Sequence, residues 1–292
     1  MECLALYNNN PQEINARITF EEVYQEYYDD KYLRNKKKTY SASSIRSCQS
    51  AFANLAELHK MPIADLRTSQ MQNCIDNCSL KHASLELMVG LLKQVSKFAL
   101  QRDYIKKDYA QFVRVNVPDD DEKGVPFTET EIKKLWKNKD DYSVKIILIM
   151  IYTGMRISEL EKLEMHLDEG YVVGGVKTKA GKNRIIPVHK AIAPFMNDIG
   201  DDFNGSRFRD EYFHATMARL GMSKASTGER HTPHDCRHTF SWLADKYKID
   251  SLAKHLIMGH SISKMDIELS TYGHRTKEEL IAEIGKIKID TV

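Results

Sequence analysis

The feature that most constrains the fold of this chain is a helical spacing of apolar residues that runs through most of its length. In the clearest stretch, from Leu85 to Ala99, apolar side chains recur at intervals of three and four residues, as they do along one face of an α-helix. A second such stretch runs from Ile45 to Leu55. No strand pattern interrupts residues 17–115, so this region is predicted to be a small helical bundle.

Residues 171–188 depart from the helical pattern. Two short apolar runs flank the polar sequence Lys-Thr-Lys-Ala-Gly-Lys-Asn-Arg, which is typical of a β-hairpin in a small antiparallel sheet. The helical pattern resumes afterwards and continues to the end of the chain. The predicted fold class is therefore mainly α, with one small antiparallel β-sheet.

Composition predicts where the domains begin and end. Residues 1–16 are polar and are expected to form a tail or linker. Residues 116–126 contain two prolines, a glycine and an acidic run, which is typical of an interdomain linker. We therefore expect a helical domain at 17–115 and a second, mixed α/β domain at 127–292.

Three Thr-x-x-Glu sequences predict where helices begin. They start at Thr19, Thr128 and Thr276, and each has the form of a capping box, in which the threonine and glutamate satisfy the free N–H groups of a helix start. The last one predicts a C-terminal helix over 275–287 with an apolar stripe.

Charge and cysteine content limit the setting in which the chain works. The formal net charge is only +2, but residues 16–117 hold 16 lysines and arginines against 11 acidic residues, which favours a polyanionic partner. The five cysteines include no C-x-x-C pair, so a reducing compartment is expected. The longest apolar run, 146–152, is too short to span a bilayer, and no secretion signal is visible. We expect a cytoplasmic protein without a membrane partner.

The first candidate for chemistry is Arg156 in the sequence Thr-Gly-Met-Arg-Ile-Ser-Glu-Leu. Phosphoryl transfer spreads negative charge over the non-bridging oxygens, and a site without clustered carboxylates for a metal needs fixed cations, of which arginine is the best suited. Glycine before Arg156 allows close backbone approach, a helix after it would fix the side chain, and Glu159 is placed to orient it. The alternative is an ordinary i,i+3 surface pair on a helix.

The second candidate pair is His234 and Arg237, which follow Pro233. Proline favours a helix start, so both residues would project from one face of its first turns, where backbone N–H groups also favour an anion. The alternative is a metal site, because His234 and His238 are spaced i,i+4; Arg237 between them would repel a cation, and no third ligand is evident.

Three further residues are weaker candidates by themselves. Lys179 lies in the predicted hairpin turn, where it could protonate a departing 5′-oxygen, although Lys177 and Lys182 compete for that role. His260 follows a glycine that ends a helix and could donate to a phosphate oxygen. Tyr272 is suited to a reversible reaction, since its attack exchanges one phosphodiester for another.

Taken in order, these segments resemble the signature boxes of the tyrosine recombinases, also called the phage integrase family. The four boxes are residues 154–160, 234–240, 258–261 and 272–274. The resemblance extends over 128–290, and this part of the chain is similar to integrases of Gram-positive phages and conjugative transposons. Residues 17–115 resemble the core-binding domain of that family more loosely. It implies a site-specific recombinase that cleaves and rejoins DNA through a 3′-phosphotyrosyl link, without metal or ATP.

The resemblance also implies a role for each candidate residue. Arg156 and Arg237 would clamp the scissile phosphate with support from His260. His234 would help to deprotonate the nucleophile or stabilise the transition state. Lys179 matches the hairpin lysine of the family.

Tyr272 would be the nucleophile, with Tyr247 and Tyr212 as fallbacks. The interval of 12 residues from His260 to Tyr272 is slightly longer than is typical of the family, and extra residues around 263–266 would account for it. Such integrases often carry a further N-terminal domain for arm-type DNA sites. This sequence contains no segment for one, and its polar start is either a trimmed linker or the start of a short member of the family.

The expected partner is double-stranded DNA, held between the two domains. The residues predicted to contact it are Lys36, Lys37, Lys38, Arg46, Lys93 and Lys97; solvated charges are the alternative for any one of them. The resemblance further implies a homo-tetramer in the synaptic complex, accessory DNA-bending or excision factors, and a nucleoid-associated location in a bacterial or phage-infected host. It also implies exchange of the C-terminal helix between protomers, for which packing in its own protomer is the alternative. The alternative functions are a type IB topoisomerase and a non-catalytic DNA-binding regulator of the same fold.

Overall fold

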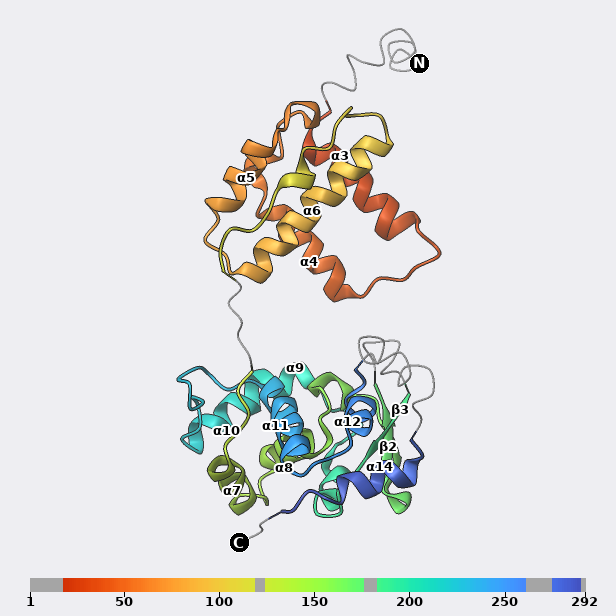
Figure 1. Ribbon diagram of the computed structural model, residues 1–292, viewed down its shortest axis with the longest axis vertical. Coiled ribbons are helices and arrows are strands. Elements are labelled where there is room, and N and C mark those ends of the chain that lie inside the picture. Colours follow the sequence, from red (N-terminus) through yellow and green to blue (C-terminus); the bar gives the residue numbers. More distant parts are fainter. Residues whose placement is uncertain (1–17, 119–123, 176–182, 261–274, 290–292) are drawn as a thin grey trace. The chain divides into compact units, whose positions relative to one another are not determined.

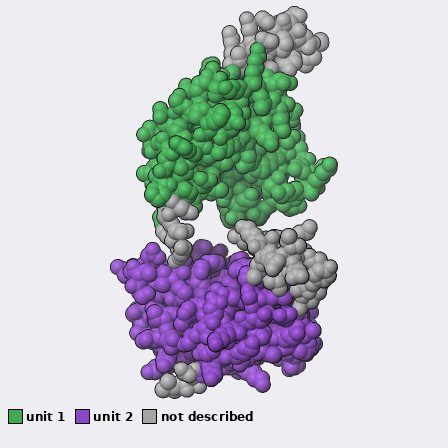
Figure 2. All heavy atoms as spheres, in the orientation of Figure 1, with its two compact units in different colours: residues 1–122 green, residues 123–292 purple. Residues whose placement is uncertain are grey.

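The computed structural model describes residues 18–118, 124–175, 183–260 and 275–289. The chain divides into two compact units, residues 1–122 and 123–292 (Figure 2). Each unit has a hydrophobic core of its own. Most of the described chain is helical, and its strands form a three-stranded antiparallel sheet. The predicted fold class is thereby confirmed.

The first unit is built from helices (Figure 1). The α-helices described in residues 18–118 are α3 (Phe20–Tyr28), α4 (Ala42–Ala53), α5 (Thr68–Asp76) and α6 (His82–Gln101). The apolar side chains predicted to face inward between Leu85 and Ala99 are all buried along α6. The second predicted stripe is only partly buried on α4, which ends at Ala53, so the buried Leu55 lies beyond the helix.

The second unit combines helices with the sheet. The α-helices and strands in its described residues are α7 (Glu129–Lys137), α8 (Tyr142–Thr153), β1 (Glu164–His166), β2 (Tyr171–Gly174), β3 (Arg184–Pro187), α9 (Gly205–Arg207), α10 (His214–Arg219), α11 (Pro233–Lys246), α12 (Ser251–Met258) and α14 (Lys277–Ile284). The strand order is β1-β2-β3, and β2 and β3 pair as the predicted hairpin, with Tyr171 opposite Pro187 and Gly174 opposite Arg184. All three capping boxes form, at the starts of α3, α7 and α14.

Helix α8 lies at the centre of the second unit. Its residues from Val144 to Thr153 are buried, apart from the partly buried Lys145, as expected for a helix surrounded by other elements. Helix α11 packs against it, with Phe240 fully buried at the contact. Arg237 lies on α11 and Arg156 follows the end of α8, so the packing of these two helices brings the two arginines that the sequence singled out close to one another.

The C-terminal helix differs from its prediction. Helix α14 runs from Lys277 to Ile284, shorter than the predicted 275–287, with Gly285 as its C-cap. Docking of its apolar stripe on a neighbouring protomer stays a prediction for the DNA-bound assembly. In the single chain, Leu280, Ile284 and Ile287 are buried in the core of their own unit, where α14 packs beside β3 and α12 (Figure 1). The physical reason is that burying each such side chain contributes about 1.5–3 kcal/mol, and the chain's own core provides that burial.

Two further observations concern the described ranges as a whole. No helix within them is long and apolar enough to cross a membrane. The cysteines they contain at positions 48, 74, 78 and 236 are all free thiols.

Candidate active site

The site begins where helix α8 ends. Gly154 caps α8 in the left-handed conformation, with φ of 65°, and donates its N–H to the carbonyl of Met150 at 3.0 Å. A Cβ at this position would lie 2.6 Å from Cδ1 of Phe240 on α11. Glycine is therefore needed at position 154 both for the turn and for the close approach of the two helices; the close backbone approach was predicted from the sequence.

Arg156 is held by Glu159 across a short 3₁₀ turn, Ile157–Glu159, rather than at the start of the α-helix that was expected. The backbone N–H of Arg156 donates to Oε2 of Glu159 at 2.8 Å, and its guanidinium contacts Oε1 at 3.3 Å. Glu159 is only 1% exposed, which excludes the alternative of a solvated surface pair. The Arg156 side chain keeps 23% of its surface exposed, so it remains accessible to a ligand.

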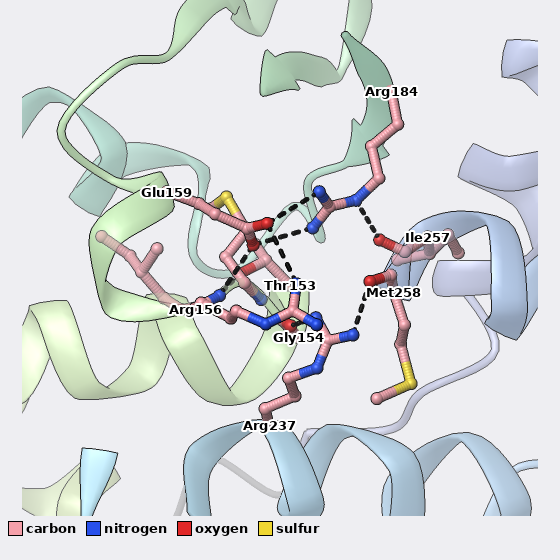
Figure 3. Close-up of polar contacts among 10 residues, drawn as sticks. Thr153, Gly154, Arg156, Glu159, Arg184, Arg237, Ile257 and Met258 are labelled. Atoms are coloured by element: carbon pink, nitrogen blue, oxygen red, sulfur yellow. Dashed lines mark hydrogen bonds and ion pairs between the residues drawn. The ribbon is translucent and has the colours of Figure 1, made fainter. Parts of the chain in front are cut away.

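Arg184, on strand β3, is a site residue that sequence reasoning missed. Its guanidinium makes a two-pronged contact with Glu159, at 3.0 Å to Oε1 and 2.9 Å to Oε2, and its Nε donates to the carbonyl of Ile257 at 2.7 Å (Figure 3). The sequence had placed this arginine in a polar turn. The available signal was its position two residues before Ile186, on the buried face of the same strand.

Arg237 is placed by two helix ends. It projects from α11, which begins at Pro233 as predicted, and it is 2% exposed. Its guanidinium donates to the carbonyl of Gly154 at 2.7 Å and to that of Met258 at 2.5 Å (Figure 3). The last carbonyls of a helix lack intrahelical partners and carry its negative dipole end, so the ends of α8 and α12 provide fixed acceptors for this cation.

The arginine cluster carries more positive than negative charge. The guanidinium groups of Arg156, Arg184 and Arg237 surround the single carboxylate of Glu159. Burial alone would raise the pKa of Glu159, but the bonds and charges of Arg184 and Arg156 lower it. Burial, and then the neighbouring Arg156, lower the pKa of Arg237 to about 10. Such a cluster would be stabilised by an additional anion.

Two histidines predicted for the site lie beside this cluster. His234 lies on α11, and His260 lies two residues after the end of α12 with an exposed side chain. Partial burial of its ring and the nearby His238, Arg237 and Arg156 lower the pKa of His234. Burial and the charge of Arg237 lower the pKa of His260 to about 4. Both imidazoles are therefore neutral at pH 7, and each can accept or share a proton there.

The alternative interpretation of His234 and His238 was a metal site, which needs further ligands. The rings of His234 and His238 lie edge to face, with centroids 4.8 Å apart. Within the described ranges, no group of three or more histidine, cysteine or acidic side chains could hold a metal ion.

Two of the predicted site residues lie outside the described residues. They are Lys179, together with its rivals Lys177 and Lys182, and Tyr272. The fallback Tyr247 is the C-cap of α11, ten residues and about 15 Å along the helix axis from Arg237, and donates its hydroxyl to the carbonyl of Lys288. The fallback Tyr212 stacks on Phe208.

The predicted DNA contacts of the first unit are exposed cations. They are Lys36, Lys37, Lys38, Arg46, Lys93 and Lys97. Among the described side chains, no carboxylate forms a salt bridge with any of the six, whereas Lys60 of the same unit is paired with Glu21. Unpaired surface cations such as these are free to meet a polyanion.

Comparison with known proteins identifies the family of this chain. Residues 126–279, more than half of the chain, match the model of the phage integrase family. The tyrosine recombinase XerD of Staphylococcus haemolyticus is 25% identical over 224 residues, which cover 68% of this chain and 73% of that protein.

Two solved structures share the fold. The Tn1549 transposon integrase, in complex with circular intermediate DNA, superimposes with a TM-score of 0.66 at 20% identity and covers 91% of this chain and 99% of that chain. A lambda integrase, solved as a tetramer bound to a Holliday junction, gives a TM-score of 0.69 at 16% identity, covering 83% of this chain and 77% of that chain.

Proposed function

The chain belongs to the phage integrase family, and we propose that it is a site-specific DNA recombinase that cleaves and rejoins DNA strands through a 3′-phosphotyrosyl intermediate. The observation that carries this proposal is the arginine cluster. Arg156 and Arg184 share the carboxylate of Glu159, and Arg237 beside them is bonded to carbonyls at the ends of two helices. A phosphodiester bound beside the cluster would balance its excess positive charge. In the transition state of phosphoryl transfer, negative charge spreads over the non-bridging oxygens, where these fixed donors would stabilise it.

In this proposal the scissile phosphate binds between Arg156 and Arg237. Their planar, permanently charged groups donate to the two non-bridging oxygens. His260, next to the end of α12, donates a further hydrogen bond. Glu159 and Arg184 do not touch the phosphate, and they keep Arg156 and the end of α12 in place through the bonds described above.

The chemical step exchanges one phosphodiester for another. The Tyr272 oxygen attacks phosphorus while the bond to the 5′-oxygen breaks, which leaves the phosphate joined to tyrosine and to the 3′-oxygen. His234 takes the tyrosine proton, and Lys179 gives a proton to the departing 5′-oxygen. A 5′-hydroxyl then attacks the phosphotyrosine and releases Tyr272, so the bond energy is retained. We expect EDTA to leave the cleavage rate unchanged.

The first unit is proposed to supply affinity for duplex DNA. The exposed cations from Lys36 to Lys38, with Arg46, Lys93 and Lys97, would contact phosphates and make binding strongly dependent on salt. This assigns the unit covering residues 17–115 as the core-binding domain and 127–292 as the catalytic domain.

A tetramer on DNA is proposed for the synaptic complex, by analogy with the lambda integrase tetramer. Exchange of the C-terminal helix would expose Leu280, Ile284 and Ile287, at about 1.5–3 kcal/mol each, unless an equivalent groove of the neighbour receives them. Every protomer both gives and receives a helix only in a closed ring of protomers, so only there is the cost of exposing these side chains fully offset. Accessory DNA-bending or excision factors and association with the nucleoid belong to the same proposal.

Two other functions would use the same fold. A type IB topoisomerase would relax plasmid that lacks a cognate site, whereas a recombinase should require its site. A non-catalytic regulator would bind DNA without forming covalent adducts.

The decisive variant is Tyr272→Phe, assayed on a nicked suicide substrate that traps the covalent intermediate. We expect unchanged DNA binding and complete loss of the protein–DNA adduct. Adducts that persist in this variant would place the nucleophile elsewhere, and Tyr247→Phe and Tyr212→Phe then identify it.

A further inference from the structure

His231 is a buried histidine that the proposed mechanism does not use. It is 1% exposed and lies between the first turns of α7 and α11. Its Nδ1 is 3.1 Å from Oδ2 of Asp235, and its Nε2 is 3.3 Å from Oε1 of Glu131. Its ring stacks on Phe127, with centroids 4.2 Å apart and an angle of 16° between the planes.

Both carboxylates already act as helix caps. Oε2 of Glu131 accepts the N–H of Thr128 at 2.7 Å, and Oδ2 of Asp235 accepts the N–H of Thr232 at 2.8 Å. Ionised carboxylates only accept hydrogen bonds, so each of these two contacts is a hydrogen bond only if the facing nitrogen of His231 carries a proton. A neutral imidazole has one N–H and one lone pair, and only the imidazolium donates from both nitrogens.

We propose that His231, as an imidazolium, is a positioning residue of the recombination site, which joins the start of α7 to the first turns of α11. His234 and Arg237 project from those turns, one and two residues away from Asp235. This inference rests on the proposed function, since it concerns the geometry in which the phosphate is held. His231 itself does not touch the substrate.

The segment that enters the second unit reinforces this junction. The N–H of Phe127 donates to Oγ1 of Thr239 at 2.8 Å, on α11. A Cβ on Gly124 would lie 2.2 Å from Cδ2 of His238, so the chain passes directly against the same helix. Loss of the His231 proton would leave a buried lone pair facing a carboxylate, which would loosen the joint between these elements.

The position of the titration follows from the groups around the ring. Burial alone would lower the pKa of His231, but Asp235 on α11 and Glu131 on α7, the charged groups that face it, raise it above 6.5. A raised pKa in the folded state means that the stabilisation is complete below about pH 6.5 and is lost as pH rises through the folded pKa. Cleavage should therefore weaken on the alkaline side.

The informative variant is Glu131→Gln. A glutamine keeps the capping box, because its carbonyl still accepts from Thr128, while its amide N–H₂ can donate to Nε2 of a neutral His231. The matched control is Glu22→Gln in the first unit, where Thr19 and Glu22 form the same capping box at 2.8 Å.

Two measurements on the full chain test the proposal. The first is NMR titration of the histidine rings, with His231→Gln used to assign the signal. The second is the rate of adduct formation from pH 6 to 9 on the suicide substrate. We expect a His231 pKa above 6.5 that falls in Glu131→Gln, and a ratio of the Glu131→Gln rate to the wild-type rate that rises several-fold around the wild-type pKa.

The proposal is overturned if the His231 pKa is at or below 6.5, if Glu131→Gln leaves that pKa unchanged, or if Glu22→Gln changes the pH profile in the same way. Failure of the proposed function has a separate signature. In that case no adduct forms at any pH, while the histidine titration can still be read.

Discussion

The two units of this molecule use their cationic side chains in opposite ways. In the first unit, Lys36, Lys37 and Lys38 are exposed and form no salt bridge with the described residues. In the second, Arg184 and Arg237 are buried, and each is fixed by acceptors that belong to Glu159 or to the ends of helices. The exposed lysines can attract a polyanion without holding it in one geometry. The buried arginines are held in one geometry, and their positive charge exceeds the negative charge of the single carboxylate beside them.

This difference suggests a division of labour. Exposed cations gain little from any single contact, are screened by salt and contribute to affinity. Buried, preorganised donors do not have to reorganise when charge develops, so they contribute to rate. The predictions below test this division, in order of decreasing effect.

The largest expected effect is that of Arg237→Lys. Lysine keeps the charge but has no planar fork, so it cannot hold the carbonyls of Gly154 and Met258 and a phosphate oxygen together. Single-turnover cleavage at saturating protein should slow by about 10²–10³-fold. Equal losses in affinity and in rate would contradict the division of labour.

The next effect concerns stability. Arg184→Met leaves the carboxylate of Glu159 buried without its two-pronged partner, so the free energy of unfolding should fall by about 3–5 kcal/mol in denaturant titrations. Arg207→Met is the matched control, because Arg207 pairs with Glu211 on the surface, and it should cost less than about 1 kcal/mol. Similar losses of unfolding free energy in the two variants would mean that the buried Arg184–Glu159 pair stabilises the fold no more than a surface ion pair does.

A smaller effect is expected in the first unit. Replacing Lys36, Lys37 and Lys38 by glutamine should reduce the slope of log affinity against log salt by up to about 0.9 for each phosphate that is no longer neutralised. Binding titrations at several salt concentrations measure this slope. Lys60→Gln is the control, since Lys60 is already paired, and a slope change of equal size there would contradict the assignment of the DNA surface.

The smallest effect is that of His260 on acid stability. Its pKa of about 4 lies below the unfolded value, so the unfolded state binds more protons as pH falls from about 6.5 to 4, and the folded state loses stability over that window. Thermal unfolding midpoints should therefore fall more steeply with acid in the wild type than in His260→Gln. Parallel curves for the two proteins would contradict this account.

Local patterns in the sequence predicted the fold well, because they depend on neighbouring residues. The capping boxes at Thr19, Thr128 and Thr276 and the hairpin are confirmed, as is the turn at Gly154. The end of the C-terminal helix was predicted too late, since Gly285 stops it. The helix expected after Arg156 is a 3₁₀ turn, because Glu159 is drawn into the core by Arg184.

The supporting residues of the site could not be predicted in the same way. Arg184 meets Glu159 from 25 positions away and Ile257 from 73, and His231 meets Glu131 from 100 positions away. No local spacing encodes such pairs, which depend on how the sheet and the helices pack. The roles of Lys179 and Tyr272 remain predictions from the sequence, since both lie outside the described residues.

The central claim is that the arginine cluster serves the charge of the scissile phosphate. Its most direct test compares cleavage of a normal substrate with cleavage of one that carries an uncharged methylphosphonate at the scissile position, in the wild type and in Arg237→Ala. Arg209→Ala, which removes an exposed arginine paired with Asp210, serves as the control. The account predicts that the phosphate-to-phosphonate rate ratio falls at least about tenfold in Arg237→Ala, an interaction of about 1.4 kcal/mol, and is unchanged in the control. The same ratio in all three proteins would contradict it.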